Sequence, residues 1–321
     1  MKTAMIVLSD TGNPRNRRSV ALNDMRAISE IYERAGSEVR ILYREDMEGK
    51  LSLSEYDNLF VLYATLINFG GKQSDYVTRT IDLINNFQGQ VVVFANDVMD
   101  PVNNKERSGF KRIERPVIYA SPNGVGGSKT GTIELAVSEE LEINQSFVIG
   151  QRLSQLPDVD MEPQYDVVYG GRGRPAMRRR LREVAKRHSL LVYSKIAKSM
   201  EGTRAKVFDS QYNFDNAQLR VINSLGKYSL MLKEKRKVYF TSRVFEQLFS
   251  NSIVLFDKSW PTLNYFWNEQ NSFDGSVKDL LTKMNIPYSK ERVKEQHELA
   301  RSFDYDSYIN QEAEELAKVL G

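Results

Sequence analysis

The sequence of 321 residues contains no cysteine and only two histidines. Without cysteine, a disulfide framework, a thiolate zinc site and a cysteine nucleophile are excluded. With only His188 and His297 present, catalysis is expected to use carboxylates, cations and backbone dipoles. No stretch approaches the about 18 apolar residues of a membrane span, and the N-terminal apolar run is too short for a signal peptide. We therefore expect a soluble cytoplasmic protein with no membrane partner.

The net charge of +3, from 45 basic and 42 acidic residues, conceals one strongly basic segment. Between Gly170 and His188 the chain carries eight basic residues and the single acid Glu183. Smaller basic clusters lie at residues 15–18 and 233–237. A solvated helix face explains part of this charge, but basic clusters at two loops also suit a polyanionic partner.

Apolar runs alternate with helical patterns in two separate parts of the chain. In the first part we expect helices near Val20–Ala35 and Ser74–Asn86, alternating with strands at Thr3–Leu8, Glu38–Tyr43, Leu59–Leu66 and Gln90–Ala95. The rhythm resumes after a Pro-containing linker at Gln155–Gln164, with a strand at Asp166–Tyr169 and a basic helix at Pro175–Arg187. This α/β alternation predicts two Rossmann-like domains with parallel sheets, covering residues 1–160 and 161–305, followed by a helix in 306–321.

The sharpest local feature is a strand that runs into Gly170 and Gly171, with a helix opening directly behind them. Helix N-termini present unpaired N–H groups, and glycine lets a ligand approach the backbone. Nearby are Arg172, Arg174 and Arg178, so this loop predicts a diphosphate site. The alternative is a glycine turn before a solvated basic helix, because neither a dinucleotide fingerprint nor a Walker loop is present.

Two further features suggest chemistry without proving it. Arg243 and Glu246 share a helix face at a spacing of three; they form either an ordinary ion pair or, beside a phosphate loop, contacts to a nucleotide phosphate and ribose. Asp97 follows the strand Gln90–Ala95, at the end where open α/β sheets bind ligands. It is either a turn residue or a general base for a hydroxyl, with Asp100 as its competitor.

Several of these segments, in the same order, resemble the DNA β-glucosyltransferases of T-even bacteriophages, and more broadly the GT-B glycosyltransferases. The segments that carry the resemblance are Tyr56–Leu59, Ile67–Lys72, Phe94–Pro101, Asp166–Gly171 with Arg174 and Arg178, Arg243–Glu246 and Val254–Asp257. The Asn-Phe-Gly-Gly-Lys piece in Ile67–Lys72 favours the phage DNA enzymes over the wider superfamily. Residues 102–163 do not align.

The resemblance implies a GT-B fold, with two Rossmann-like domains facing a central cleft and the C-terminal helix returning to the first domain. It implies inverting transfer of a sugar from UDP-glucose, or from another donor such as UDP-arabinose. The acceptor would be the hydroxymethyl group of 5-hydroxymethylcytosine in double-stranded DNA, with the base flipped out of the helix. A divalent cation, Mg²⁺ or Mn²⁺, would assist a monomeric enzyme in the cytoplasm of an infected bacterium.

The resemblance also assigns roles to residues. Asp97 matches the catalytic base, and Asp24 stands where the family has a glutamate near the sugar and metal. The donor site would comprise Gly170, Gly171, Arg172, Arg174, Arg178, Arg243 and Glu246, with Arg172 replacing a serine. We assign DNA contacts to Arg15, Arg17, Arg18 and Lys72. The alternatives are a GT-B enzyme with another modified base or a non-DNA acceptor, and a non-catalytic DNA- or nucleotide-binding protein with a degenerate transferase fold.

Overall fold

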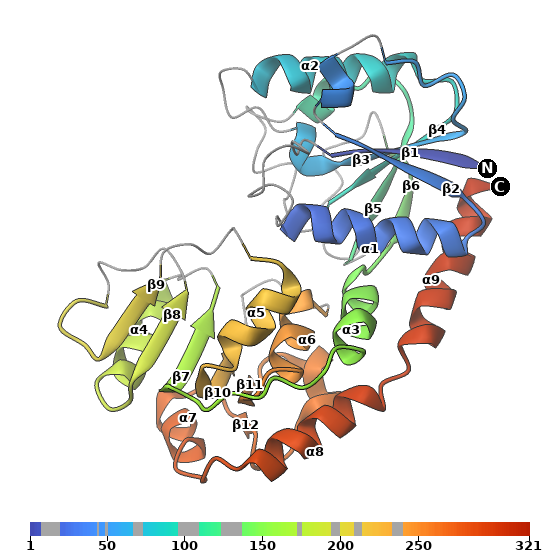
Figure 1. Cartoon of the computed structure of the whole chain (residues 1–321). Coiled ribbons are helices and arrows are strands. Elements are labelled where there is room, and N and C mark those ends of the chain that lie inside the picture. The colour runs from blue at the N-terminus through green and yellow to red at the C-terminus, as the bar shows by residue number, and fades with distance from the viewer. Residues whose placement is uncertain are drawn as a thin grey trace. The chain divides into compact units, whose positions relative to one another are not determined.

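The structure, a computed structural model, describes most of the chain and divides it into two compact units. The described residues are 1–7, 20–43, 45–48, 51–66, 73–95, 109–122, 137–171, 175–193, 200–208, 214–232 and 240–321. The first unit comprises Met1–Val148 together with Asp306–Gly321, and the second comprises Ile149–Tyr305. Figure 1 colours both by residue number.

The first unit is built on a sheet of six strands in the order β2-β1-β3-β4-β5-β6, with every neighbouring pair parallel. The strands are β1 (Lys2–Ile6), β2 (Glu38–Leu42), β3 (Asn58–Leu62), β4 (Gln90–Phe94), β5 (Val117–Ser121) and β6 (Val137–Glu142). The accompanying helices are α1 (Val20–Arg34), α2 (Gln73–Asn86), α3 (Ser146–Ser154, which continues into the second unit) and α9 (Tyr305–Leu320), with short 3₁₀ turns at Glu45–Glu48, Tyr63–Leu66 and Gly109–Arg112.

The second unit repeats this architecture with a different strand order, β12-β11-β10-β7-β8-β9, again all parallel. Its strands are β7 (Tyr165–Gly170), β8 (Leu190–Tyr193), β9 (Ala205–Phe208), β10 (Gly226–Met231), β11 (Ile253–Asp257) and β12 (Ser272–Phe273). Its helices are α4 (Pro175–Ala185), α5 (Asn216–Asn223), α6 (Ser242–Leu248), α7 (Val277–Lys283) and α8 (Lys290–Arg301), with a 3₁₀ turn at Pro261–Phe266.

The strand orders identify where each sheet is suited to bind a ligand. In the second unit the chain starts at β7, moves outward through β8 and β9, and returns to the other side of β7 as β10. Ligands of open α/β sheets bind at the carboxyl ends of the strands where the order reverses, which is here between β7 and β10. The corresponding position in the first unit lies between β1 and β3.

The central strands of the sheets are buried because they are apolar on both faces. All five residues of β3 are buried, and so are the last four residues of β4, as expected where helices cover both sides of a parallel sheet. The predicted strand at Leu59–Leu66 is too long, since β3 ends at Leu62 and a 3₁₀ turn follows. The expectation of two Rossmann-like halves with parallel sheets is confirmed.

The C-terminal helix α9 packs within the first unit, although it is last in the sequence. A buried stripe of Ile309, Ala313, Leu316 and Leu320 runs along it at helical spacing. Tyr308 stacks on Phe147 with ring centroids 4.5 Å apart. Both chain termini therefore belong to the same unit (Figure 1).

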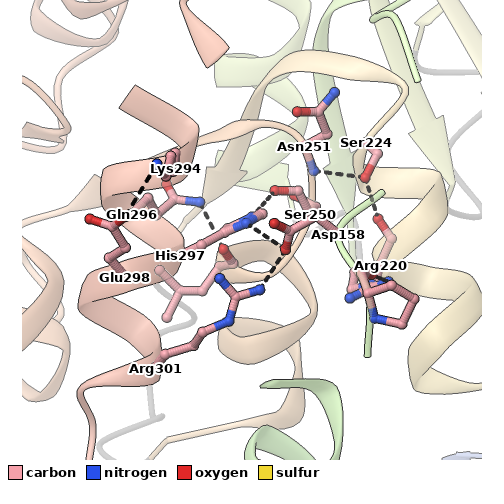
Figure 2. A network of polar contacts seen from close by, with 12 residues as sticks. Asp158, Arg220, Ser224, Ser250, Asn251, Lys294, Gln296, His297, Glu298 and Arg301 are labelled. Carbon is pink, nitrogen blue, oxygen red and sulfur yellow. Dashed lines mark hydrogen bonds and ion pairs between the residues drawn. The ribbon is translucent and has the colours of Figure 1, made fainter. Parts of the chain in front are cut away.

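The predicted linker at Gln155–Gln164 has no helix or strand, yet it is fastened to the second unit. Asp158 lies 2.5 Å from an Arg301 nitrogen and 3.1 Å from Nδ1 of His297, as Figure 2 shows. The Arg220 guanidinium donates to the Pro157 carbonyl at 2.6 Å. The side-chain amide of Asn251 donates to the Met161 carbonyl, also at 2.6 Å. These hydrogen bonds hold the segment against α5 and α8 of the second unit.

Candidate functional site

The predicted phosphate loop begins where β7 ends, and its two glycines have separate structural reasons. A Cβ on Gly170 would overlap the ring of Tyr193, which occupies that space at the end of β8. Gly171 has φ +144°, a backbone conformation that side chains disfavour. Helix α4 then begins at Pro175, a residue suited to the first helical position. The strand–glycine–helix arrangement that the sequence predicts is therefore present.

Arg243 reaches this loop from α6, the helix that follows β10. A Cβ on Gly171 would lie 2.8 Å from Nη1 of Arg243, so the guanidinium lies directly over the Gly171 backbone. Backbone N–H groups and a guanidinium together form a common arrangement for binding phosphate oxygens. The structure thus brings together two features that lie more than seventy residues apart in the sequence.

Glu246 lies one turn further along α6 and is buried, with 3% of its surface exposed. Its Oε1 accepts a hydrogen bond of 2.6 Å from the side-chain amide of Asn216, the first residue of α5. A buried carboxylate needs such a partner, since an unpaired buried charge is costly. The amide fixes the orientation of the carboxylate, as a group that accepts hydrogen bonds from hydroxyls requires.

Tyr193 completes this cluster from the end of β8. Its hydroxyl donates to the Asn223 side chain at 3.1 Å. Burial raises the pKa of Tyr193, and the negative charge of Glu246 raises it further while Arg243 opposes the shift. The phenol therefore stays neutral and serves as a hydrogen-bonding group beside the two charged residues.

Two other predicted site residues, Arg178 and Asp24, lie in the described part of the chain. Arg178 is exposed on α4, close to the start of the helix. Asp24 is buried on α1 of the first unit, with 3% of its surface exposed. The remaining predicted residues lie outside the described part of the chain: Asp97, Arg172, Arg174, Arg15, Arg17, Arg18 and Lys72. Asp97 follows Ala95, the last described residue after β4, by two positions.

The described residues contain no group of three or more histidine or acidic side chains that could hold a metal ion. Magnesium-type ions often bind through one or two carboxylates and substrate phosphates, so a site of that kind requires no such group. In the same described part of the chain, no helix is long and apolar enough to cross a membrane.

Three residues of the cluster were not predicted from the sequence: Tyr193, Asn216 and Asn223. Tyr193 ends strand β8, and its position at the carboxyl end of an apolar run was the available signal. Asn216 and Asn223 lie 30 residues from their partners Glu246 and Tyr193. No local pattern marks them, because only the folded chain brings α5 against α6 and β8.

Two units, each a six-stranded parallel sheet of Rossmann type, define the GT-B class of fold. Among solved structures, the chain is similar to T4 phage β-glucosyltransferase (BGT) in complex with UDP and Mn²⁺, with a TM-score of 0.74 and 14% identity over 100% of this chain and 99% of that one. An aspartate-to-alanine mutant of the T4 enzyme in complex with UDP-glucose matches at a TM-score of 0.73 and 16% identity, with the same coverage.

A third similar structure is described as the DNA-modifying enzyme β-glucosyltransferase with and without uridine diphosphoglucose. It has a TM-score of 0.74 and 14% identity, over 100% of this chain and 99% of that chain. No family model and no curated protein sequence matches this chain. At such low identity the similarity shows the fold, and the fold agrees with the expectation drawn from the sequence.

Proposed function

We propose that this protein is a DNA glycosyltransferase. It would transfer a sugar from a UDP-sugar to the hydroxymethyl group of a modified pyrimidine in duplex DNA. The observation that carries the proposal is the position of Arg243 over Gly171, with Glu246 one helical turn away. This cluster lies at the end of β7, where the strand order of the second unit reverses. Similar structures of full length hold UDP or UDP-glucose.

In this proposal the second unit binds the donor. Gly170 and Gly171, with Arg172, Arg174, Arg178 and Arg243, bind the diphosphate, and Glu246 accepts hydrogen bonds from the ribose hydroxyls. The departing UDP gains negative charge as its bond to the sugar breaks, so positive groups fixed at the diphosphate favour the transition state more than the ground state. A divalent cation, Mg²⁺ or Mn²⁺, would add positive charge at the same diphosphate.

The first unit provides the acceptor side, with Asp97 as the general base. A primary alcohol must lose its proton as it attacks the anomeric carbon, and a carboxylate can accept that proton. Direct attack inverts the anomeric centre and requires no covalent intermediate. The target base would be flipped out of the duplex, since an enzyme cannot otherwise reach its hydroxymethyl group. Asp24 is assigned near the sugar, and Arg15, Arg17, Arg18 and Lys72 near the DNA.

The decisive experiment is mass spectrometry of nucleosides after incubating hydroxymethylated duplex DNA with the protein and a panel of UDP-sugars. We expect one sugar, glucose by default, to be added to 5-hydroxymethylcytosine. Transfer from UDP-arabinose, or to 5-hydroxymethyluracil, would keep the reaction class and change the substrate. UDP binding without transfer to any DNA would instead support a GT-B enzyme with another acceptor.

The base is tested separately with Asp97→Ala. We expect this variant to lose transfer while it still binds the UDP-sugar, and the Asp-to-Ala mutant of the T4 enzyme does hold UDP-glucose. Asp100→Ala, which removes the neighbouring carboxylate, is the matched control and should keep most of the activity. Transfer at the wild-type rate by Asp97→Ala would exclude this residue as the base.

A further inference from the structure

Helix α4 presents an unusually basic outward face in the second unit. Its apolar residues Met177, Leu181, Val184 and Ala185 are buried. The opposite face, with the two residues that follow the helix, exposes Arg178, Arg179, Arg182, Lys186 and Arg187. Over residues 175–187 the only acid is Glu183, which pairs with Lys186 at 2.6 Å.

The edge of the sheet extends this basic face. Strand β9 is the outermost strand of the sheet (Figure 1). Arg204, directly before this strand, and Lys206 within it are exposed. The backbone N–H of Arg204 donates to the Ala185 carbonyl at 3.0 Å, and its guanidinium lies 3.4 Å from the Arg187 carbonyl. The end of α4 and the start of β9 therefore form one continuous surface. We call it the α4–β9 surface, consisting of Arg179, Arg182, Lys186, Arg187, Arg204 and Lys206, and it excludes Arg178, which belongs to the proposed donor site.

Part of this charge has a structural explanation. Arg180, on the same helix, forms an ion pair of 2.9 Å with Asp257, which is buried at the end of β11. Lys186 and Arg187 lie at the C-terminal end of α4, where cations are favourable because of the helix dipole. These residues are accounted for by the fold of the unit itself.

Arg179 and Arg182 have no such explanation. They lie three residues apart on one helix, and Arg182 lies four residues from both Arg178 and Lys186, so like charges meet along the face. The first turn of α4 contains no acidic residue, although its dipole favours one there. Glu183, Glu201 and Asp209 are the acids nearest in the sequence to the basic residues of the surface. Such a local conflict in an otherwise consistent fold is typical of a functional surface.

The composition of the surface indicates which polyanion it fits. Four of its six cations are arginine, whose planar guanidinium binds phosphate through two parallel hydrogen bonds. A membrane-binding helix would expose large apolar side chains beside its basic residues, whereas α4 buries its own. We propose that the α4–β9 surface binds the phosphate backbone of duplex DNA without reading its sequence. The proposal rests on the proposed function in one respect, the choice of DNA as the polyanion.

The test compares two double variants of the full-length protein. Arg179→Gln with Arg182→Gln removes two charges from the surface. Lys278→Gln with Lys294→Gln removes two charges from exposed positions on α7 and α8 and serves as the matched control. Fluorescence anisotropy measures binding to an unmodified DNA duplex at increasing sodium chloride concentrations. None of these four residues belongs to the proposed donor site, so UDP binding should be unchanged in both variants.

For the surface variant we expect weaker DNA binding and a shallower plot of log affinity against log salt. The slope should fall by about 0.9 for each phosphate that the protein no longer neutralises, or about 1.8 for both, and the control variant should keep the wild-type slope. The thermal unfolding temperature of the surface variant should be equal to or above that of the wild type, since removing like-charge neighbours does not weaken α4. This result separates weaker binding of DNA from a damaged fold.

Equal slopes and affinities for the surface variant and the control would overturn the proposal. The salt slope could fall for the surface variant while the wild-type protein transfers no sugar to any DNA. That pair of results would support DNA binding by the α4–β9 surface and refute the proposed glycosyltransferase activity. If the surface variant transfers sugar to DNA and also binds DNA like the wild type, the DNA-binding role of the α4–β9 surface is refuted and the proposed enzyme activity is not.

Discussion

The candidate donor site draws residues from four elements. Tyr193 of β8 packs against Gly170, Arg243 of α6 lies at Gly171 after β7, and Asn216 of α5 binds Glu246. Each contributes a different group: the glycines offer backbone that a ligand can approach, Tyr193 a neutral hydroxyl, Asn216 an amide and Arg243 a positive charge. Because the elements are secured by the core of the unit, the groups hold their positions before any ligand arrives. Such preorganisation reduces the entropy that binding would otherwise cost.

Glu246→Gln tests the ribose contact without changing the size of the side chain. We expect the affinity for UDP to fall about 10- to 100-fold, because a hydrogen bond to a charged group contributes about 1.5–3 kcal/mol. Isothermal titration calorimetry measures this affinity. Glu298→Gln, at an exposed position on α8, is the control and should bind UDP normally. An unchanged affinity in Glu246→Gln would remove this residue from the donor site.

Gly170→Ala tests the packing of the loop against Tyr193. The added Cβ would overlap the phenol ring, so we expect a loss of about 1–3 kcal/mol in the free energy of unfolding. Chemical denaturation measures the loss. The double variant Gly170→Ala with Tyr193→Ala should lose less stability than the two single changes added together, since the ring that causes the overlap is gone. Strict additivity would mean that Tyr193 does not occupy this space.

Sequence patterns could predict the charged and glycine residues of the site, but not the residues that hold them in position. Gly171, Arg243 and Glu246 were predicted because glycine pairs and charge spacing are local signals. Asn216 orients Glu246 only through a contact between two helices, and asparagine at a helix start is ordinary in sequence. The roles of the predicted residues remain proposals.

Among the elements, strands with apolar runs were predictable and polar ones were not. β1 to β5 and β7 coincide with apolar runs in the sequence, whereas β6 has the sequence Val-Ser-Glu-Glu-Leu-Glu. It is a strand because β5 pairs with it in parallel, a long-range contact that overrides local preference. The short run at Ser146–Ile149 begins helix α3, since an apolar run of that length fits a strand or a helix equally.

The docking of α9 in the first unit places one carboxyl group in an unfavourable position. Glu312 accepts a hydrogen bond of 3.1 Å from the backbone N–H of Asn144. Its other oxygen is buried without a hydrogen-bond partner among the described residues. Burial raises the pKa of Glu312 to about 8, and the charge of Glu142 adds to the shift. The folded protein therefore holds this group protonated at pH values where the unfolded chain would release the proton.

We expect the stability supplied by protonated Glu312 to be complete below about pH 4.5 and to disappear as the pH rises to about 8. Glu312→Gln keeps an acceptor for Asn144 but cannot ionise, so its stability should fall less than that of the wild type between about pH 4.5 and 8. Urea unfolding at several pH values measures the difference. Glu315→Gln, exposed on the same helix, should behave like the wild type. Parallel curves for wild type and Glu312→Gln would show that this group does not titrate as expected.

A second prediction at this scale concerns the segment Gln155–Gln164, which Asp158 helps to hold against the second unit. Burial alone would raise the pKa of Asp158, but the hydrogen bond and charge of Arg301 and the proximity of His297 outweigh it and lower the pKa. We expect Asp158→Asn to release the segment and increase its cleavage rate in limited proteolysis, with fragments identified by mass. Asp160→Asn, at an exposed position in the same segment, is the control. Equal cleavage of both variants would mean that Asp158 does not hold the linker.

For the whole molecule, the division into units predicts the effect of removing α9. Deleting residues 306–321 takes away Ile309, Leu316 and the other buried residues of the stripe, all from the first unit. Hydrogen exchange measured by mass spectrometry should show faster exchange in β1 to β6 and nearly unchanged exchange in β7 to β12. Uniform acceleration across both sheets would indicate that the units do not unfold separately.

The position of α9 also has a consequence for how the protein is made. The hydrogen bond between Asn144 and Glu312 joins residues 168 positions apart, and the one between Arg34 and Asp306 joins residues 272 apart. A ribosome completes the entire second unit before it releases the helix that the first unit lacks. The first unit, although synthesised first, is therefore finished last, and its incomplete surface is the one that a chaperone would meet during translation.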